Sequence, residues 1–260
     1  MVYELDIAKA STSALANIFR TNDVVIDTAG FVSEKQSFVD LTDHIVASLE
    51  SIPEGKRPFC WFMAGAAILD MDEHGRRGVD LPLAKRTYWP HRVNFNRICQ
   101  TTLDWRILCP GPMVAQSPLG LDRMRISLAQ LPVQMPTFSR FLPKALALPF
   151  FLYRVPEMII SYADAAALML AHTTPNDEMS YHRVGLACRL VCAEGKSVGQ
   201  PDQFLLPSAR SMFVSEYGLT LSQAGCANCS RLIATSGRAS STNVSSAGRL
   251  FLRLYNNASP

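Results

Sequence analysis

The chain has 260 residues, of which 48% are hydrophobic and 18% are charged, and its formal net charge is +3. This length can bury a complete α/β core, and the composition is that of an ordinary soluble globular protein. The excess positive charge lies in residues 191–260, which hold six basic and three acidic side chains spaced among serines and small residues. A nucleic-acid-binding protein would gather its basic residues on one face. We therefore expect no nucleic-acid partner.

The sequence also indicates the cellular compartment of the protein. Its seven cysteines are scattered, without the spacing of a disulfide framework, and its first six residues have neither a basic start nor an apolar run. Residues 141–160 are the most apolar stretch, but three prolines, Lys144 and Arg154 interrupt it. We expect a cytoplasmic protein without a membrane partner. Aromatic residues within 141–153 leave open a membrane-surface role, although an apolar substrate lid explains them more simply.

Strands and helices are predicted to alternate along the first half of the chain. Apolar runs bounded by turn residues predict buried parallel strands at residues 24–28, 58–63 and 105–109. Helical periodicity or capping predicts helices at about 11–19, 38–49 and 87–100, and residues 2–5 form a short strand. This order requires crossover connections. It predicts a three-layer α/β fold with a parallel, Rossmann-like sheet.

The pattern changes after Pro112. Residues 113–157 contain several prolines and predict an irregular insertion with one or two short helices. A further strand of the same sheet at 158–160 follows, then Ser161 as the cap of a helix that begins at Ala163, and a last strand at 182–188. From about residue 191, serine, threonine, glycine and asparagine dominate. We therefore expect a folded domain over residues 1–190 and a low-structure tail over 191–260.

Three of the predicted strands end in turns of small or rigid residues. The turns are Thr28-Ala29-Gly30, Ala64-Gly65-Ala66 and Pro110-Gly111-Pro112. Each taken alone is compatible with a plain strand-end turn. Their recurrence at successive carboxyl ends indicates the crevice in which open α/β sheets bind their ligands.

Two segments together carry a family resemblance. Thr102-Leu-Asp-Trp-Arg-Ile-Leu-Cys-Pro-Gly-Pro112 and Met158-Ile-Ile-Ser-Tyr-Ala-Asp-Ala-Ala166 resemble the atypical short-chain dehydrogenase/reductase families, which are NAD(P)H-binding, Rossmann-type proteins of the NADH-flavin-reductase-like kind. The resemblance implies hydride transfer from NAD(P)H to a small carbonyl, quinone or flavin-type acceptor. It places the cofactor-binding positions at Asp6, Ile7, Thr28, Ala29, Gly30, Gly65, Pro110, Gly111 and Pro112.

The resemblance also suggests a catalytic pair. The family at large uses Tyr-x-x-x-Lys on the helix that precedes the Pro-Gly strand, and Tyr88 and Arg92 stand there with the same spacing. Tyrosine would supply a proton, while arginine could hold phosphate or ribose but does not replace lysine chemically. Pro90 suggests that the helix starts at Trp89 or Pro90, which would leave Tyr88 in the preceding loop as a structural aromatic residue.

One family feature is missing from the sequence. No G-x-G-x-x-G or G-x-x-G-x-x-G occurs in it, so the glycine-rich turn that binds the pyrophosphate is absent. We expect a sheet that lacks its first β-α-β unit and a chain that binds NAD(P)H weakly or not at all. The rival interpretation is a non-catalytic remnant or interaction module. No metal site is expected, because the acidic loop around Asp70 and the pair Cys226 and Cys229 lack ligand spacing. The oligomeric state stays open.

Overall fold

The computed structural model describes residues 2–136, 138, 141–188 and 251–253. Its centre is a five-stranded sheet with the order β2-β3-β4-β8-β6. The strands are β2 (Val24–Asp27), β3 (Phe59–Met63), β4 (Trp105–Pro110), β8 (Arg183–Cys188) and β6 (Met124–Leu128). The first four run parallel, and β6 pairs antiparallel with β8. The three strands predicted before Pro112 are therefore confirmed as adjacent and parallel.

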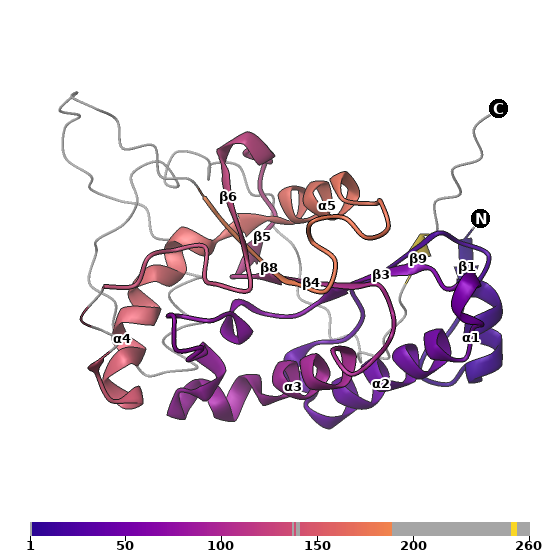
Figure 1. The fold of residues 1–260 in the computed structure, drawn as a ribbon, viewed down its shortest axis with the longest axis horizontal. Helices are drawn as coiled ribbons and strands as arrows, with labels where there is room; N and C mark the ends of the chain where they lie inside the picture. The colour runs from indigo at the N-terminus through magenta and orange to yellow at the C-terminus, as the bar shows by residue number, and fades with distance from the viewer. Residues whose placement is uncertain (1, 137, 139–140, 189–250, 254–260) are drawn as a thin grey trace, which may run out of the picture.

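Helices cover both faces of this sheet (Figure 1). One face packs against α1 (Thr12–Phe19), α2 (Gln36–Glu50) and α3 (Pro82–Ile98), and α4 (Lys144–Arg154) adds to the same core. The other face packs against α5 (Tyr162–Ala171). This three-layer α/β arrangement is the predicted Rossmann-like fold.

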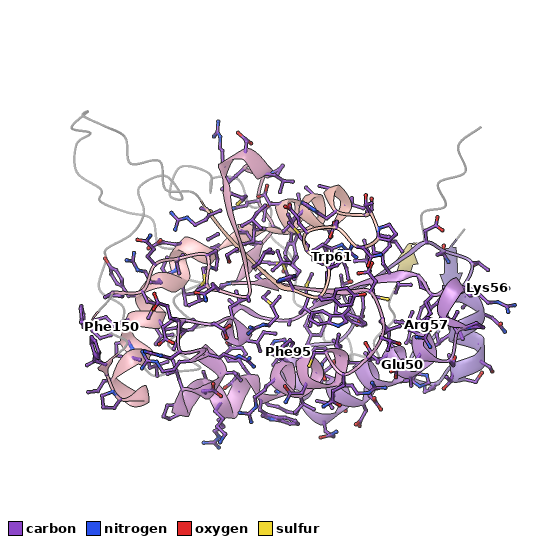
Figure 2. The ribbon with its side chains drawn as sticks, in the orientation of Figure 1. Glu50, Lys56, Arg57, Trp61, Phe95 and Phe150 are labelled. Atoms are coloured by element: carbon purple, nitrogen blue, oxygen red, sulfur yellow. The ribbon has the colours of Figure 1, made fainter. Side chains whose placement is uncertain are left out.

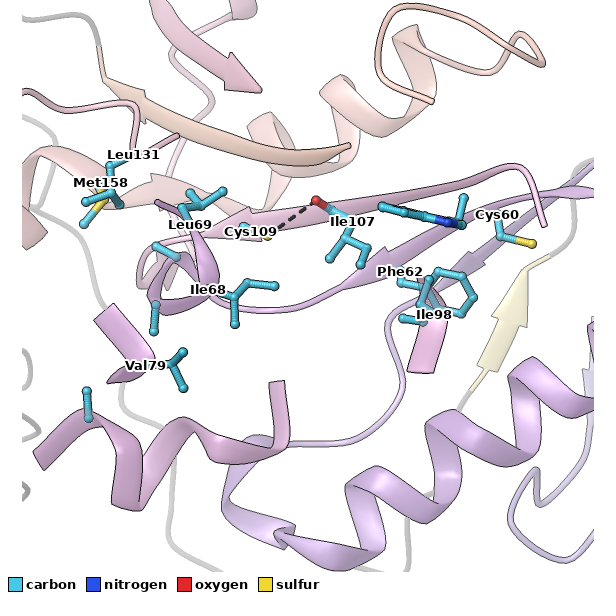
Figure 3. Close-up of a cluster of buried hydrophobic side chains, with 14 of the residues drawn as sticks. Cys60, Phe62, Ile68, Leu69, Val79, Ile98, Ile107, Cys109, Leu131 and Met158 are labelled. Atoms are coloured by element: carbon cyan, nitrogen blue, oxygen red, sulfur yellow. Dashed lines mark hydrogen bonds between the residues drawn. The ribbon is translucent and has the colours of Figure 1, made fainter. Parts of the chain in front are cut away.

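Alternation along β3 shows how the two cores are divided. Cys60 and Phe62 point into the cluster shared with α1 to α4, part of which Figure 3 shows, whereas Phe59 and Trp61 point into the cluster beneath α5. Successive side chains of a strand face opposite sides of a sheet, so a strand buried on both faces must be apolar throughout. This explains why the run Phe59–Met63 has almost no polar residue.

Two predicted caps are present. Ser11 accepts a hydrogen bond from the Ala14 backbone at the start of α1, and Ser161 accepts one from the Asp164 backbone at the start of α5. At the carboxyl end of α2, Arg57 donates hydrogen bonds to the backbone carbonyls of Glu50 and Ile52 (Figure 2). These contacts satisfy backbone groups that a helix leaves unpaired at its ends.

Residues 158–160 were predicted to lie in the main sheet, and this is wrong. Met158 ends a 3-10 turn (Val155–Met158), and β7 (Ile160–Ser161) pairs with β5 (Met113–Val114) in a separate two-stranded sheet. The place beside β4 is taken by β8. Pro156 explains part of the difference, because proline cannot donate a ladder hydrogen bond and favours the turn.

The start of α3 also differs from the prediction. The helix begins at Pro82, five residues earlier than expected, and continues through Pro90, so Tyr88 lies inside the helix and not in a preceding loop. Pro82 stands in the first turn, where the missing N–H costs nothing. Burial of Ala84 and Ile98 on the same helix outweighs the single hydrogen bond that Pro90 removes.

The remaining differences concern strands. β6 lies within the stretch expected to be irregular, and its signal was the alternation of apolar Met124, Ile126 and Leu128 with Arg125 and Ser127. The predicted first strand exists as β1 (Val2–Glu4), but it pairs antiparallel with β9 (Phe251–Arg253) outside the main sheet. Residues 191–250 of the predicted tail lie outside the described residues. None of the described helices is long and apolar enough to cross a membrane.

Candidate functional site

The carboxyl ends of β2, β3 and β4 meet at one edge of the sheet, because these strands are adjacent and parallel. The predicted positions Thr28, Ala29 and Gly30 follow β2, and Gly65 follows β3. Pro110 ends β4, and Gly111 and Pro112 follow it. The structure thus brings seven of the predicted cofactor positions to the edge at which parallel sheets bind ligands.

The end of β2 holds a buried carboxyl group. Asp27 is only 7% exposed, and one of its carboxylate oxygens accepts a hydrogen bond from the Ala29 backbone at 2.9 Å. Burial raises the pKa of Asp27 to about 6, against the opposing effect of that hydrogen bond. Gly30 follows with a φ of +81°, and a β-carbon there would lie 2.5 Å from the Phe38 ring. Glycine is therefore required at this turn.

The end of β3 faces an imidazole. A β-carbon on Gly65 would lie 3.1 Å from Nε2 of His91, so the absence of a side chain lets the ring approach the backbone. The His91 ring meets Phe38 edge-on at 5.6 Å and stacks on Tyr88 at 6.2 Å. His91 is 8% exposed, and burial lowers its pKa to about 4. At neutral pH this site therefore carries an uncharged imidazole.

The end of β4 is held by the second sequence motif. A β-carbon on Gly111 would lie 2.6 Å from the Met158 carbonyl, and Ile160 donates to the Pro112 carbonyl at 3.2 Å. Asp164, fully buried at the start of α5, accepts hydrogen bonds from the backbones of residues 119 and 120 at 3.1 and 3.0 Å. The motif thus fixes the loop that follows the Pro-Gly-Pro turn.

The predicted pair Tyr88 and Arg92 lies on α3. The ring stacked on Tyr88 is that of His91. Arg92 forms an ion pair with Asp80 at 3.4 Å, and both side chains are about one-third exposed. A second cation, Lys35, donates to the carbonyl of Thr87, the residue before Tyr88, at 3.0 Å.

Asp6 and Ile7 follow β1, which does not belong to the main sheet. The Asp6 carboxylate accepts a hydrogen bond from the Ala8 backbone and pairs with Lys9 at 3.0 Å. The hydrogen bond from Lys9 holds the pKa of the exposed Asp6 below its usual range. Ile7 is buried in the core with α1. Asp6 thus forms a turn in the described residues, and its place in the cofactor site stays a prediction.

The acidic loop is tied by arginines. Asp70 pairs with Arg77 at 3.1 Å and with Arg183 at 2.8 Å, and Asp72 pairs with Arg76. Both Arg77 and Arg183 lie over the Phe95 ring, which Figure 2 labels on α3. No cluster of His, Cys, Asp and Glu in the described ranges could hold a metal ion.

Sequence reasoning missed two side chains at this edge. Asp27 was treated as part of an apolar strand, although a carboxyl group at the last position of a buried strand is itself a signal. His91 was not among the predicted site residues, although its position three residues after Tyr88 places both rings on one helix face. That spacing could have indicated an aromatic cluster.

The fold and these strand-end turns define the class: a Rossmann-like α/β protein. No protein-family model and no curated protein sequence matches the chain. Among solved structures, a candidate exported protein from Burkholderia pseudomallei is similar, with 17% identity, a TM-score of 0.51 and coverage of 70% of this chain and 78% of that one. This likeness shows the fold.

Two further solved structures are similar at lower scores. SP1627, a candidate NADH-flavin reductase from Streptococcus pneumoniae, has 16% identity and a TM-score of 0.47 and covers 71% of this chain and 78% of that one. A Rossmann-fold NAD(P)-binding family protein from Shigella flexneri has 12% identity and a TM-score of 0.44, with coverage of 77% and 74%.

Proposed function

We propose that this chain is an NAD(P)H-binding protein and an oxidoreductase that transfers hydride to a small carbonyl, quinone or flavin-type acceptor. One observation carries the proposal. Three adjacent parallel strands, β2, β3 and β4, end at one edge of the sheet in turns of small or rigid residues. Turns of this kind let a nucleotide approach the backbone at the carboxyl ends of strands.

The residues at this edge fit the uncharged parts of the cofactor better than its phosphates. Tyr88 is half-buried and stacks on the buried, neutral ring of His91, so Tyr88 offers aromatic surface that suits a nicotinamide ring or ribose. A pyrophosphate needs backbone N–H groups or cations, and the Ala29 N–H already bonds to Asp27. Arg92 is the proposed phosphate-binding or ribose-binding cation, because its exposed pair with Asp80 is weak enough to exchange.

Bound NAD(P)H would supply the hydride, and the chain would supply the proton. Tyr88 remains the proposed donor, since a phenol can protonate the oxygen of a reduced carbonyl. The neutral His91 ring stacked beside it would orient Tyr88 without adding charge. The rival interpretation, a non-catalytic module with the same fold, differs in one respect: it needs no nucleotide.

The experiment is a titration of the purified chain with NADH and with NADPH, followed by ligand-observed NMR, which detects weak binding. Without a glycine-rich turn, two or three charge-assisted hydrogen bonds of roughly 1.5–3 kcal/mol each are missing, so we expect a dissociation constant in the ~1 mM range. Gly65→Val should abolish this binding, because its side chain would meet the His91 ring.

Gly55→Ala is the matched control, because a β-carbon at Gly55 would meet no atom within 4 Å. The proposed site would be overturned if neither NADH nor NADPH binds. It would also be overturned if wild type and Gly65→Val bind the nucleotide equally. A dissociation constant near ~1 μM would instead show that the expectation of weak binding is wrong and would support an active enzyme.

A further inference from the structure

One edge of the central sheet has no neighbouring strand in the part of the chain that the structure describes. β2 pairs with β3 alone, and β6 forms the opposite edge. The two edge strands differ in composition. β6 has Arg125 near its middle, a common device against edge pairing, whereas β2 reads Val-Val-Ile-Asp, without proline or lysine. β2 therefore has the composition of an interior strand at an edge position.

The backbone of β2 offers a defined set of hydrogen-bonding groups at this edge. The Asp23 carbonyl accepts a hydrogen bond from the Phe59 N–H of β3 at 3.1 Å. Because successive residues of a strand direct their backbone groups to opposite sides, Val25 and Asp27 also face β3. Val24, Ile26 and Thr28 consequently direct their N–H and C=O groups away from the sheet.

We propose that β2 pairs antiparallel with β2 of a second copy of this chain, so that two sheets join across a two-fold axis. The positions of the Asp23 and Asp27 carboxylates decide which register of this strand pair is favoured. A pair centred on Val25 places Asp23 opposite Asp27 of the second copy, and directly opposed like charges destabilise a sheet. A pair centred on Ile26 places Asp27 opposite Val25 and Val24 opposite Thr28, so no carboxylates oppose each other. In this register Ile26 faces Ile26 of the second copy.

The apolar side chains near this edge fit the same arrangement. Val24 and Ile26 are half-buried and lie at the margin of the core cluster beneath α5. A second β2 covers their open flank and adds a cross-strand pair of β-branched residues. The interface is self-complementary, as a two-fold dimer requires, and it goes beyond the proposed cofactor site because it needs no ligand.

The test uses charge complementation at the two-fold axis. We expect wild type to sediment as a dimer, and Ile26→Lys and Ile26→Glu each to raise the dimer dissociation constant by at least ~10-fold. Mixing the two variants should restore a dimer, because residue 26 faces its own counterpart only in the proposed register. Ile126→Lys, on the exposed opposite edge, is the matched control and should leave the mass unchanged.

Circular dichroism checks that each variant is folded. If the Ile26 variants unfold, Val24→Lys mixed with Thr28→Glu tests the same register, since these positions face each other in it. A wild-type chain that stays monomeric at all concentrations overturns the proposal. The proposal is also overturned if the Ile26 substitutions leave the dimer dissociation constant unchanged, or if the two variants do not form a mixed dimer.

Discussion

Buried charged groups have partners of opposite charge at the amino ends of the parallel strands, but not at their carboxyl ends in the described residues. At the amino end, Arg106 of β4 is fully buried, and its guanidinium donates to Asp177 at 3.0 Å, to the Thr174 carbonyl at 2.6 Å and to Ser180 at 2.8 Å. Asp104 lies 3.5 Å from the same group. At the carboxyl end, Asp27 and His91 are buried without a partner of opposite charge in the described residues.

The pKa values record this difference. Burial alone would raise the pKa of Asp177, but hydrogen bonds from Arg106 and the Met179 backbone hold it below its usual range. Burial dominates at the other end, where it raises the pKa of Asp27 and lowers that of His91. Removal of one member of a buried charge pair strongly destabilises a protein, whereas unpaired titratable groups with shifted pKa values are typical of a functional site.

The strongest test of this difference between the two strand ends is to remove Arg106. Arg106→Met should leave the partly buried Asp177 and Asp104 without their cation and cost ~3–5 kcal/mol of unfolding free energy, measured by urea denaturation. Arg92→Met is the control, because its pair with Asp80 is partly exposed and should cost at most ~1 kcal/mol. Equal losses in the two variants would show that the amino end is not specially stabilised.

His91 should make the protein less stable in acid. The folded state keeps the ring neutral down to about pH 4, while an unfolded histidine takes up a proton near pH 6.5. Stability is therefore lost as the pH falls from 6.5 to 4, by ~3 kcal/mol. His91→Phe should remove this loss, as measured by unfolding at pH 7 and pH 4.5. An unchanged pH dependence would contradict the burial of a neutral imidazole.

Asp27 should act in the opposite direction over nearly the same range. Its pKa of about 6 exceeds the ordinary value of 3.8, so the protonated form stabilises the fold below pH 3.8 and this contribution is lost as the pH rises to 6. Asp27→Asn should gain ~2–3 kcal/mol at pH 7.5 and little at pH 3.5. The exposed Asp23→Asn serves as control, and a gain of similar size there would refute the assignment.

The smallest expected effect concerns the cap that holds α5. Ser161→Ala removes the acceptor for the Asp164 backbone and a donor to the Asp164 carboxylate, and it should cost ~1 kcal/mol. Ser11→Ala at α1 removes the cap and an exposed hydrogen bond with Ser13, but no bond to a buried carboxylate. A smaller loss for Ser161→Ala than for Ser11→Ala would mean that Asp164 holds its loop without help from Ser161.

The sequence predicted the parts of this molecule in which local pattern and tertiary structure agree. Apolar runs such as Phe59–Met63 can be buried on both faces only in a parallel sheet, so the three central strands followed from composition. Residues 158–160 have the same apolar character, but long-range competition with β8 for the edge of β4 decided their place. Such competition is not visible in a short window.

The candidate site was predictable in its backbone and not in its side chains. Gly30 and Gly65 stood out as strand-end glycines, and the structure gives each a close neighbour. The neighbours themselves, Phe38 and His91, come from α2 and α3, and their contacts depend on how these helices lie on the sheet.

The pairing of β1 with β9 bears on how the molecule is made. β1 contains the first described residues and β9 the last, and their short antiparallel ladder joins them directly. The ribosome synthesises β1 long before β9. The central sheet and α1 to α5 can therefore assemble while β1 is still unpaired. Closing so long a loop adds an entropic cost that a three-residue ladder barely offsets. The ladder is therefore a late step in biosynthesis and the first contact we expect to open when the protein is pulled from its ends.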